Sequence, residues 1–208
     1  MPFSLRFAMP VLVALACTSC TAVKVVTHST STDPIDAPAG LYHVDPHHWS
    51  VTFDVDHLGY SRFVMRFDRM EGDLDFHPED PTRSSVTARI AAASLDTNVA
   101  ELDELVRGPD MLDAEHFPEI RFVSHQLLVT GKNTGEMSGE LTIHGVTRPV
   151  TLAVTFNGGA ANPLNDKFTL GFTATGHFDR SSFGLSRWYP AVGREIRLTI
   201  EAEFEKSN

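Results

Sequence analysis

Apolar and polar residues alternate along most of this chain from Leu41 onward. The stretch 168–174 places Phe, Leu, Phe and Ala at every second position, and 196–204 continues the pattern with five apolar residues. Successive side chains of a β-strand point to opposite faces, so this period predicts strands with one face in a core and the other in water. Clusters rich in Gly, Asn, Asp and Pro separate the strands, for instance at 77–81 and 157–163.

One stretch has the period of a helix instead. Its apolar residues recur at helical spacing, at Val99, Leu102, Leu105 and Val106. Residues 96–98 offer an N-cap, Gly108 and Pro109 end the pattern, and 110–116 predict a further short turn. A long series of strands with one helical interruption favours a closed barrel, because closure removes the unpaired edges of a sheet.

The first 20 residues predict an export signal. The uncharged apolar stretch 7–16 is shorter than the about 20 residues that a membrane span needs, and it fits the core of a signal peptide. Small residues before Cys17 predict a lipoprotein-type signal with the lipid anchor on Cys17, and Cys20 is the alternative anchor. A plain secretory signal with incidental cysteines is the other interpretation. Residues 21–40, rich in Ser, Thr, Pro and Ala, predict a flexible linker.

The composition argues against several functional classes. The chain has 17 Lys and Arg against 27 Asp and Glu, a net charge of −10 without a basic cluster, so nucleic acid is not expected as a partner. Both cysteines lie in the export signal, which leaves the folded domain without a disulfide framework, a Cys-based zinc site or a Cys nucleophile. Ser, His and Asp stand in no recognisable catalytic order, so we expect no catalytic residue and no enzymatic activity.

The ten histidines do not predict a metal site. His47 and His48 are adjacent, so on a strand they would point to opposite faces, and no His-x-His motif occurs. Imidazole is a good metal ligand, but this spacing favours polar histidines in loops and at strand ends. We therefore expect no metal ion and no cofactor.

Two short motifs predict turns. Asp179 and Arg180 predict either a structural ion pair or turn brace, or a cation at the barrel mouth that faces a ligand head group, and we favour the structural role. His144 and Gly145 predict a tight turn between strands, in which the glycine supplies a positive φ.

Five sequence blocks resemble the YceI-like family and occur in the family's order over about 41–204. They are Tyr-His-Val-Asp-Pro-His at 42–47 with the following 50–59, Ser-Leu-Asp-Thr-Asn at 94–98, parts of 105–124, Gly-Glu-Leu-Thr-Ile-His-Gly-Val-Thr-Arg-Pro-Val at 139–150, and Phe-Asp-Arg-Ser-Ser-Phe-Gly-Leu at 178–185. The resemblance implies an all-β, eight-stranded antiparallel lipocalin-like barrel with an internal cavity, over 41–206, with one or two short helices between about 97 and 116. It also implies an exported protein that binds a polyisoprenoid or a similar long apolar molecule.

Two departures from the family pattern leave the identity of the ligand open. The stretch 99–105 reads Val-Ala-Glu-Leu-Asp-Glu-Leu where the family has Arg and Asp, and 186–190 is bulkier than the family pattern.

In such a barrel the inward positions would form the ligand-binding lining. We expect this lining to comprise Val51, Phe53, Val55, Phe63, Phe67, Phe122, Leu152, Val154, Leu170, Phe172, Leu198 and Ile200. We place Phe172 near the midpoint of the interior. The alternative is a barrel filled by these side chains, in an envelope interaction or stress protein without a ligand.

The combined expectation is a cell-envelope lipid-binding protein, periplasmic or anchored to a membrane by its N-terminus. The expected ligand is non-covalent and its role is transport, storage or sequestration. The sequence leaves the oligomeric state open, a homo-oligomer included.

Overall fold

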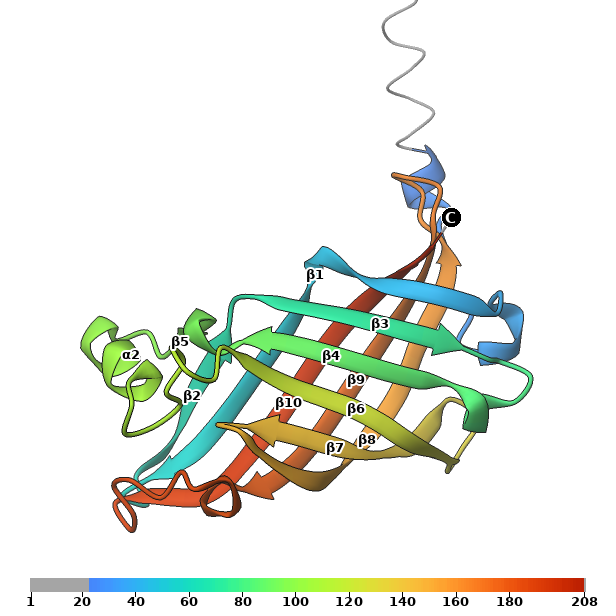
Figure 1. Cartoon of the computed structure of the whole chain (residues 1–208). Helices are drawn as coiled ribbons and strands as arrows, with labels where there is room; N and C mark the ends of the chain where they lie inside the picture. The colour runs from blue at the N-terminus through green and yellow to red at the C-terminus, as the bar shows by residue number, and fades with distance from the viewer. Residues whose placement is uncertain (1–22, 208) are drawn as a thin grey trace, which may run out of the picture.

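The computed structural model describes residues 23–207, and eight of its antiparallel strands close into a barrel (Figure 1). In ring order the strands are β1 (Gly40–His57), β3 (Met70–Phe76), β4 (Ser85–Ala91), β6 (Glu119–Val129), β7 (Thr134–Ile143), β8 (Val146–Ala161), β9 (Phe168–Asp179) and β10 (Val192–Lys206). β10 pairs with β1 and closes the ring. The predicted eight-stranded antiparallel barrel is confirmed.

Two further strands extend the sheet at one end of the barrel. β1 pairs with β3 only over 40–43, and β2 (Ser61–Phe67) takes its place along the second half of β1. β2 in turn pairs with the two-residue strand β5 (Leu95–Asp96). The turn β7–β8 is made of His144 and Gly145, with φ of 51° and 71°, as predicted for a tight hairpin.

The helices are short. Within residues 31–207 they are η1 (Pro34–Asp36), η2 (Pro81–Arg83), η3 (Ala92–Ser94), α2 (Ala100–Arg107) and η4 (Arg180–Phe183). α2 confirms the predicted helix, and 110–116 forms turns. Among the described helices, none is long and apolar enough to cross a membrane.

The predicted N-cap of the helix is wrong. Val99, and no residue of 96–98, stands at the N-cap position, where it makes no side-chain capping bond. The stabilising contact runs the other way, because Asp103 of α2 accepts hydrogen bonds from Thr97 N (2.7 Å) and Thr97 Oγ1 (2.6 Å). A side chain inside the helix thus fixes Thr97, the residue that follows β5.

The described part of the predicted linker contacts the barrel. Ser31 forms an antiparallel bridge with Gly159 of β8, through backbone hydrogen bonds of 3.0 and 2.9 Å. Asp33 forms an ion pair with Lys132 at 3.3 Å, and Ala37 is buried. The linker prediction therefore does not describe residues 31–39, which cover one end of the barrel (Figure 1). The export signal, 1–20, with its anchor candidates Cys17 and Cys20, lies outside the described residues.

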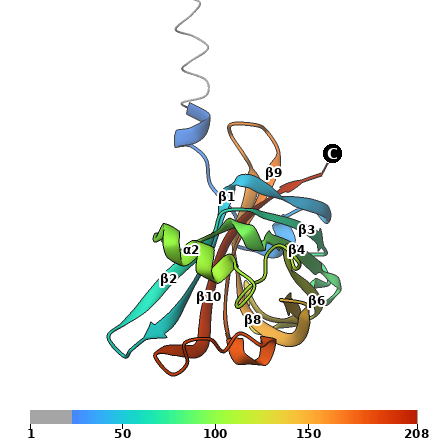
Figure 2. The same ribbon diagram turned by 60° about the vertical axis from the view of Figure 1, so that its left-hand side comes forward.

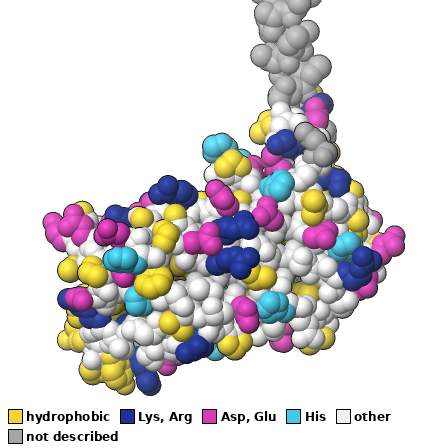
Figure 3. Space-filling view, in the orientation of Figure 1, with side chains coloured by type: hydrophobic (Ala, Val, Ile, Leu, Met, Phe, Trp, Pro, Cys, Tyr) yellow, Lys and Arg dark blue, Asp and Glu magenta, His cyan; other side chains and the backbone are white. Residues whose placement is uncertain are grey.

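The alternation seen in the sequence separates the two faces of the barrel wall. Hydrophobic side chains form one core cluster along the interior, from Tyr42 and Phe76 at one end to Leu95 and Phe183 at the other. On the outside, charged side chains of both signs are interspersed over β3, β4 and β6 (Figure 3). Burial of the inward face is the main stabilising term of such a fold.

Candidate functional site

The interior of the barrel contains two apolar cavities, of about 170 Å³ and 480 Å³. We call them the small cavity and the large cavity. Consecutive inward positions of one strand belong to different cavities: Ile120 and Leu198 line the large one, whereas Phe122 and Ile200 line the small one. The boundary between the cavities therefore falls between residues 120 and 122 of β6 and between residues 198 and 200 of β10. It follows that the two cavities lie end to end along the barrel.

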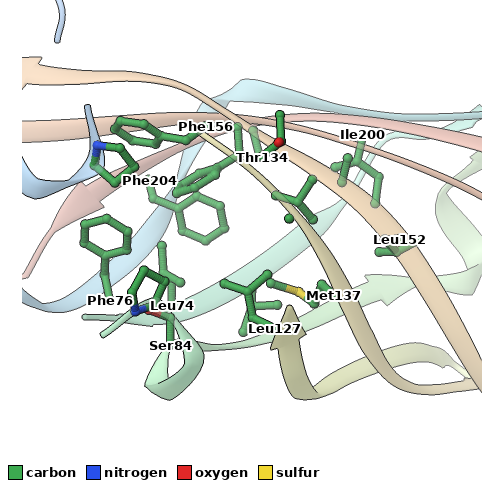
Figure 4. Close-up of a pocket in the computed structure, with 18 of the residues that line it drawn as sticks. Leu74, Phe76, Ser84, Leu127, Thr134, Met137, Leu152, Phe156, Ile200 and Phe204 are labelled. Carbon is green, nitrogen blue, oxygen red and sulfur yellow. The ribbon is translucent and has the colours of Figure 1, made fainter. Parts of the chain in front are cut away.

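The small cavity lies at the end of the barrel that residues 31–39 cover, because Pro34 is part of its wall. Figure 4 shows how Phe76, Phe156 and Phe204 lie around it. Its wall includes an aromatic cluster of Phe76, Phe156, Phe172 and Phe204, with ring centroids 5.4 Å apart for Phe156 and Phe172 and 5.9 Å for Phe172 and Phe204. Edge and tilted ring contacts of this kind stabilise beyond their buried area. Other strand residues, Pro34 of η1, Pro81 and Ser84 at η2, and residues 131–135 also contribute to the lining.

The large cavity lies at the opposite end. At this end α2 and β5 lie beside β2 (Figure 1), and Figure 2 shows α2 and β2 from another side. Strand residues form most of the wall of the large cavity. Its remaining lining comes from α2 and the loop after it, with Leu102, Val106, Met111 and Leu112, and from the segment before β10, with Leu185, Trp188 and Ala191. The apolar side of α2 therefore belongs to the cavity wall, which explains its helical spacing in the sequence.

The structure places eleven of the twelve predicted lining residues in these walls. Val51, Phe53, Val55, Phe63, Phe67 and Leu198 line the large cavity, and Phe122, Leu152, Val154, Phe172 and Ile200 line the small one. Leu170 lines neither cavity and is fully buried in the core. Binding of a ligand by these residues stays a prediction.

Two sequence-based expectations about the lining need correction. Phe172 does not lie between the cavities but inside the aromatic cluster of the small one, because its neighbours across the sheet are Phe156 and Ala202. Strand alternation also missed the lining from α2 and the loops, since it describes strands alone. The apolar spacing at 102 and 106 was the signal that could have identified the helical part.

Gly139 of β7 leaves space for the side chain of Phe122, which borders the small cavity. A Cβ atom on Gly139 of β7 would lie 2.6 Å from Phe122 Cζ and 2.4 Å from the Val123 carbonyl oxygen. Contacts this short do not occur, so Gly139 lets the Phe122 ring pack against the backbone of β7. This packing sets the position of Phe122 next to the boundary between the cavities.

Arg180 is the buried charge in the wall of the large cavity. It is only 4% exposed, and its guanidinium donates to the carbonyl oxygens of Gly193 (2.7 Å), Arg187 (2.9 Å), Val192 (2.9 Å) and Leu185. Burial lowers the pKa of Arg180, although an Arg of this kind stays protonated. The four carbonyls span the segment from η4 to β10, so Arg180 is the turn brace that the sequence favoured.

Asp179 does not form the predicted ion pair with Arg180. Its carboxylate caps η4 by accepting from Ser181 N (2.8 Å) and Ser181 Oγ (2.6 Å), and these bonds hold the pKa of Asp179 below its ordinary value. Its nearest ionic partner is Arg194, at 3.8 Å. The two neighbouring residues therefore fix the same turn through separate contacts.

Comparison with known sequences identifies the family. The model of the YceI-like domain matches residues 42–204. A UPF0312 protein of Pseudomonas putida strain W619 is 36% identical over 169 residues, which are 80% of this chain and 87% of the relative. A UPF0312 protein of Vibrio parahaemolyticus is 32% identical over 174 residues, 83% of this chain and 89% of the relative.

Solved structures share the barrel. BcnA of Burkholderia cenocepacia superposes with a TM-score of 0.70 at 24% identity, over 77% of this chain and 98% of that one. A polyisoprenoid binding domain from Saccharophagus degradans superposes with a TM-score of 0.63 at 11% identity, over 82% of this chain and all of that one. At such identities the likeness shows the fold. With the family match over nearly all of the barrel, it follows that this chain belongs to the YceI-like family.

Proposed function

We propose that this protein binds one long apolar molecule, a polyisoprenoid or a lipid of similar length, inside its barrel. The observation that carries the proposal is the pair of apolar cavities in line with each other, of about 480 Å³ and 170 Å³. Cavities that bind ligands are concave, mostly apolar and few in a protein. The relative from Saccharophagus degradans is described as polyisoprenoid-binding, which supports the same ligand class here.

The energetics favour a long chain over a small ligand. Micromolar affinity corresponds to about 8 kcal/mol, and association costs about 4–15 kcal/mol before any net binding appears. Each buried CH₂ contributes about 0.8 kcal/mol, so a ligand without strong polar contacts needs about 15–30 such groups. A ligand in the upper part of this range is larger than the cavity of about 480 Å³ and would occupy both cavities, with Phe122 and its neighbours turning aside at the boundary.

Extraction tests the proposal directly. The purified protein is extracted with organic solvent and the extract is analysed by mass spectrometry, with the envelope lipids of the host as the reference. We expect a long-chain lipid in a molar ratio near one, enriched over its share of the host lipids. An extract without such a lipid, from protein that also fails to bind geranylgeraniol after delipidation, would contradict the proposal and favour the alternative of a filled barrel.

The chain supplies its own reporter for the rebinding experiment. Its two tryptophans are Trp49 and Trp188, and Trp188 lines the large cavity. In a Trp49→Phe background, fluorescence therefore comes from Trp188 alone. We expect geranylgeraniol to change this fluorescence in a saturable way, and isopentenol, with a quarter of the carbon atoms, to change it far less.

We further propose that the protein is exported to the cell envelope and held there by a lipid on Cys17. The motive is the apolar stretch 7–16 followed by small residues and Cys17. Cells of a lipoprotein-producing host are labelled with a fatty-acid analogue, and we expect the wild type and Cys20→Ser to be labelled and Cys17→Ser to lose the label. If the wild type carries no label, the anchor does not exist; if only Cys20→Ser loses the label, Cys20 is the anchor.

A further inference from the structure

We propose that Asp45, His48 and Glu203 form a binding site for a divalent transition metal ion, with Zn²⁺ as its type, on the outside of the barrel. The proposal is independent of the lipid that the interior would bind. It differs from the expectation that the histidines have no metal role, which is untested, and it starts from an irregularity in the pairing of β1 with β10.

The strand register brings the three residues together. Val44 pairs with Phe204 and Trp49 pairs with Ala202, so the four residues 45–48 of β1 stand opposite Glu203 alone on β10. We call 45–48 the β1 bulge. Phe204 and Ala202 line the small cavity, so Glu203, between them on the strand, points to the outer face. The β1 bulge brings Asp45 and His48 close to the carboxylate of Glu203. Regular strand alternation would have placed Asp45 and His48 on opposite faces.

Local contacts orient the carboxylate of Asp45. Its side chain is only 8% exposed, its Oδ1 accepts a hydrogen bond from His47 N (2.8 Å), and its Oδ2 lies 2.8 Å from His48 Nδ1. Pro46, between them, restricts the backbone of the bulge. A backbone N–H that holds a carboxylate in place is the kind of outer-shell contact that supports metal ligands.

The geometry suits a small divalent ion. One ligand atom from each of Asp45, His48 and Glu203 lies within 4.8 Å of the other two. Ligands at about 2.0–2.2 Å from one ion are at most about 4.4 Å apart, so small side-chain rotations would complete the site. His48 is 58% exposed, which leaves the site open to solvent. Three protein ligands leave room for water as a fourth.

The donor set points to a transition metal. One imidazole nitrogen with two carboxylate oxygens suits Zn²⁺, Co²⁺ or Ni²⁺, whereas Mg²⁺ and Ca²⁺ prefer oxygen ligands alone. The two carboxylates also match the charge of a divalent ion. Bound there, the ion would tie β1 to β10 at the seam that closes the barrel, and we expect it to stabilise the fold by mass action.

A second Asp and His pair of this protein provides a matched control. His116 Nδ1 lies 2.8 Å from Asp113 Oδ1, with the same spacing of three residues as the pair of Asp45 and His48. Among residues 23–207, only the set with Glu203 brings together three metal-ligating side chains, so the pair at 113 and 116 lacks the third ligand. The control therefore separates a built site from a common hydrogen-bonded pair.

The experiment measures binding of Zn²⁺ and Co²⁺ to the purified metal-free protein, by calorimetry and by the visible absorption of bound Co²⁺, with the melting temperature as a second readout. Wild type should bind one ion, melt at a higher temperature with it, and bind Mg²⁺ and Ca²⁺ at least tenfold more weakly. His48→Gln and Glu203→Gln should weaken Zn²⁺ binding at least tenfold, while His116→Gln leaves it unchanged.

Three outcomes would overturn the proposal. The first is the absence of a saturable Zn²⁺ signal in the wild type. The second is equal Zn²⁺ affinity of Glu203→Gln and wild type, and the third is an equal loss in His116→Gln and His48→Gln. Melting of each variant without metal shows that it is folded, so a loss of binding cannot arise from loss of structure.

Discussion

Arg187 Nη1 donates to Asp110 Oδ2 over 2.5 Å, and this ion pair joins the loop after α2 to the segment before β10. The neighbours of the two residues, Met111 and Trp188, both line the large cavity. The pair thus connects two parts of the cavity wall that are 77 residues apart in the sequence. Both side chains are partly exposed, so their contact is weak enough to open without unfolding the barrel.

We predict that Asp110→Asn speeds ligand exchange and leaves stability nearly unchanged. An exposed ion pair contributes about 0–1 kcal/mol, so the melting temperature should move by no more than a few degrees. Release of a bound fluorescent lipid, followed by stopped flow, should become faster. The matched control is Asp166→Asn, which removes the ion pair with Lys24 at the opposite end of the barrel. Equal release rates for wild type and Asp110→Asn would show that this contact does not limit access.

We predict that Arg180→Met is among the most destabilising single substitutions in the chain. It removes the donor to four backbone carbonyls and leaves them without their partner in the interior. A buried carbonyl left without its donor costs about 1–3 kcal/mol, so we expect a loss of several kcal/mol for the four together, which denaturant unfolding would measure. Arg194→Met is the control, because Arg194 is half exposed and should cost less than about 1 kcal/mol. Similar losses in the two variants would refute the bracing role.

We predict that acid weakens the attachment of α2 through Asp103. Hydrogen bonds from Thr97 hold the pKa of Asp103 below its ordinary value. A carboxyl group with a lowered pKa in the folded state stabilises the fold above its unfolded pKa, near 4, and this stabilisation is lost as the pH falls through the folded value. Hydrogen exchange of α2 amides should therefore rise between pH 5 and pH 3 relative to the barrel strands. Asp103→Asn should remove most of this pH dependence, and an unchanged dependence would contradict the assignment.

The sequence contained most of the information about the barrel and its inner face. Alternation depends only on the geometry of a strand, so it identified inward residues such as Phe53 and Leu198 without knowledge of their partners. The same reasoning assigned Leu170 to a cavity, and there it failed. Inward orientation is a local property, whereas the choice between packed core and open cavity depends on side chains from other strands.

The rest of the site depends on contacts between distant segments. Nothing near 45–48 in the sequence indicates that the β1 bulge faces Glu203, because that pairing follows from the register of the first strand with the last. The brace by Arg180 likewise depends on how the segment before β10 folds back over η4. The contact of Thr97 with Asp103 replaced a cap that local propensity favoured, since tertiary packing decides between such alternatives.

The most direct test of the central claim compares two leucines on neighbouring strands. Leu198 of β10 lines the large cavity, whereas Leu170 of β9 is fully buried and lines neither cavity. We measure the lipid extracted per mole of protein and the melting temperature for wild type, Leu198→Trp and Leu170→Trp. If the barrel binds a long chain, the wild type carries lipid and Leu198→Trp loses it, the two proteins melt at the same temperature once both are delipidated, and Leu170→Trp is destabilised by about 1–3 kcal/mol through overpacking. If the wild type carries no lipid and both substitutions lower the melting temperature alike, the interior is a packed core and the account is contradicted.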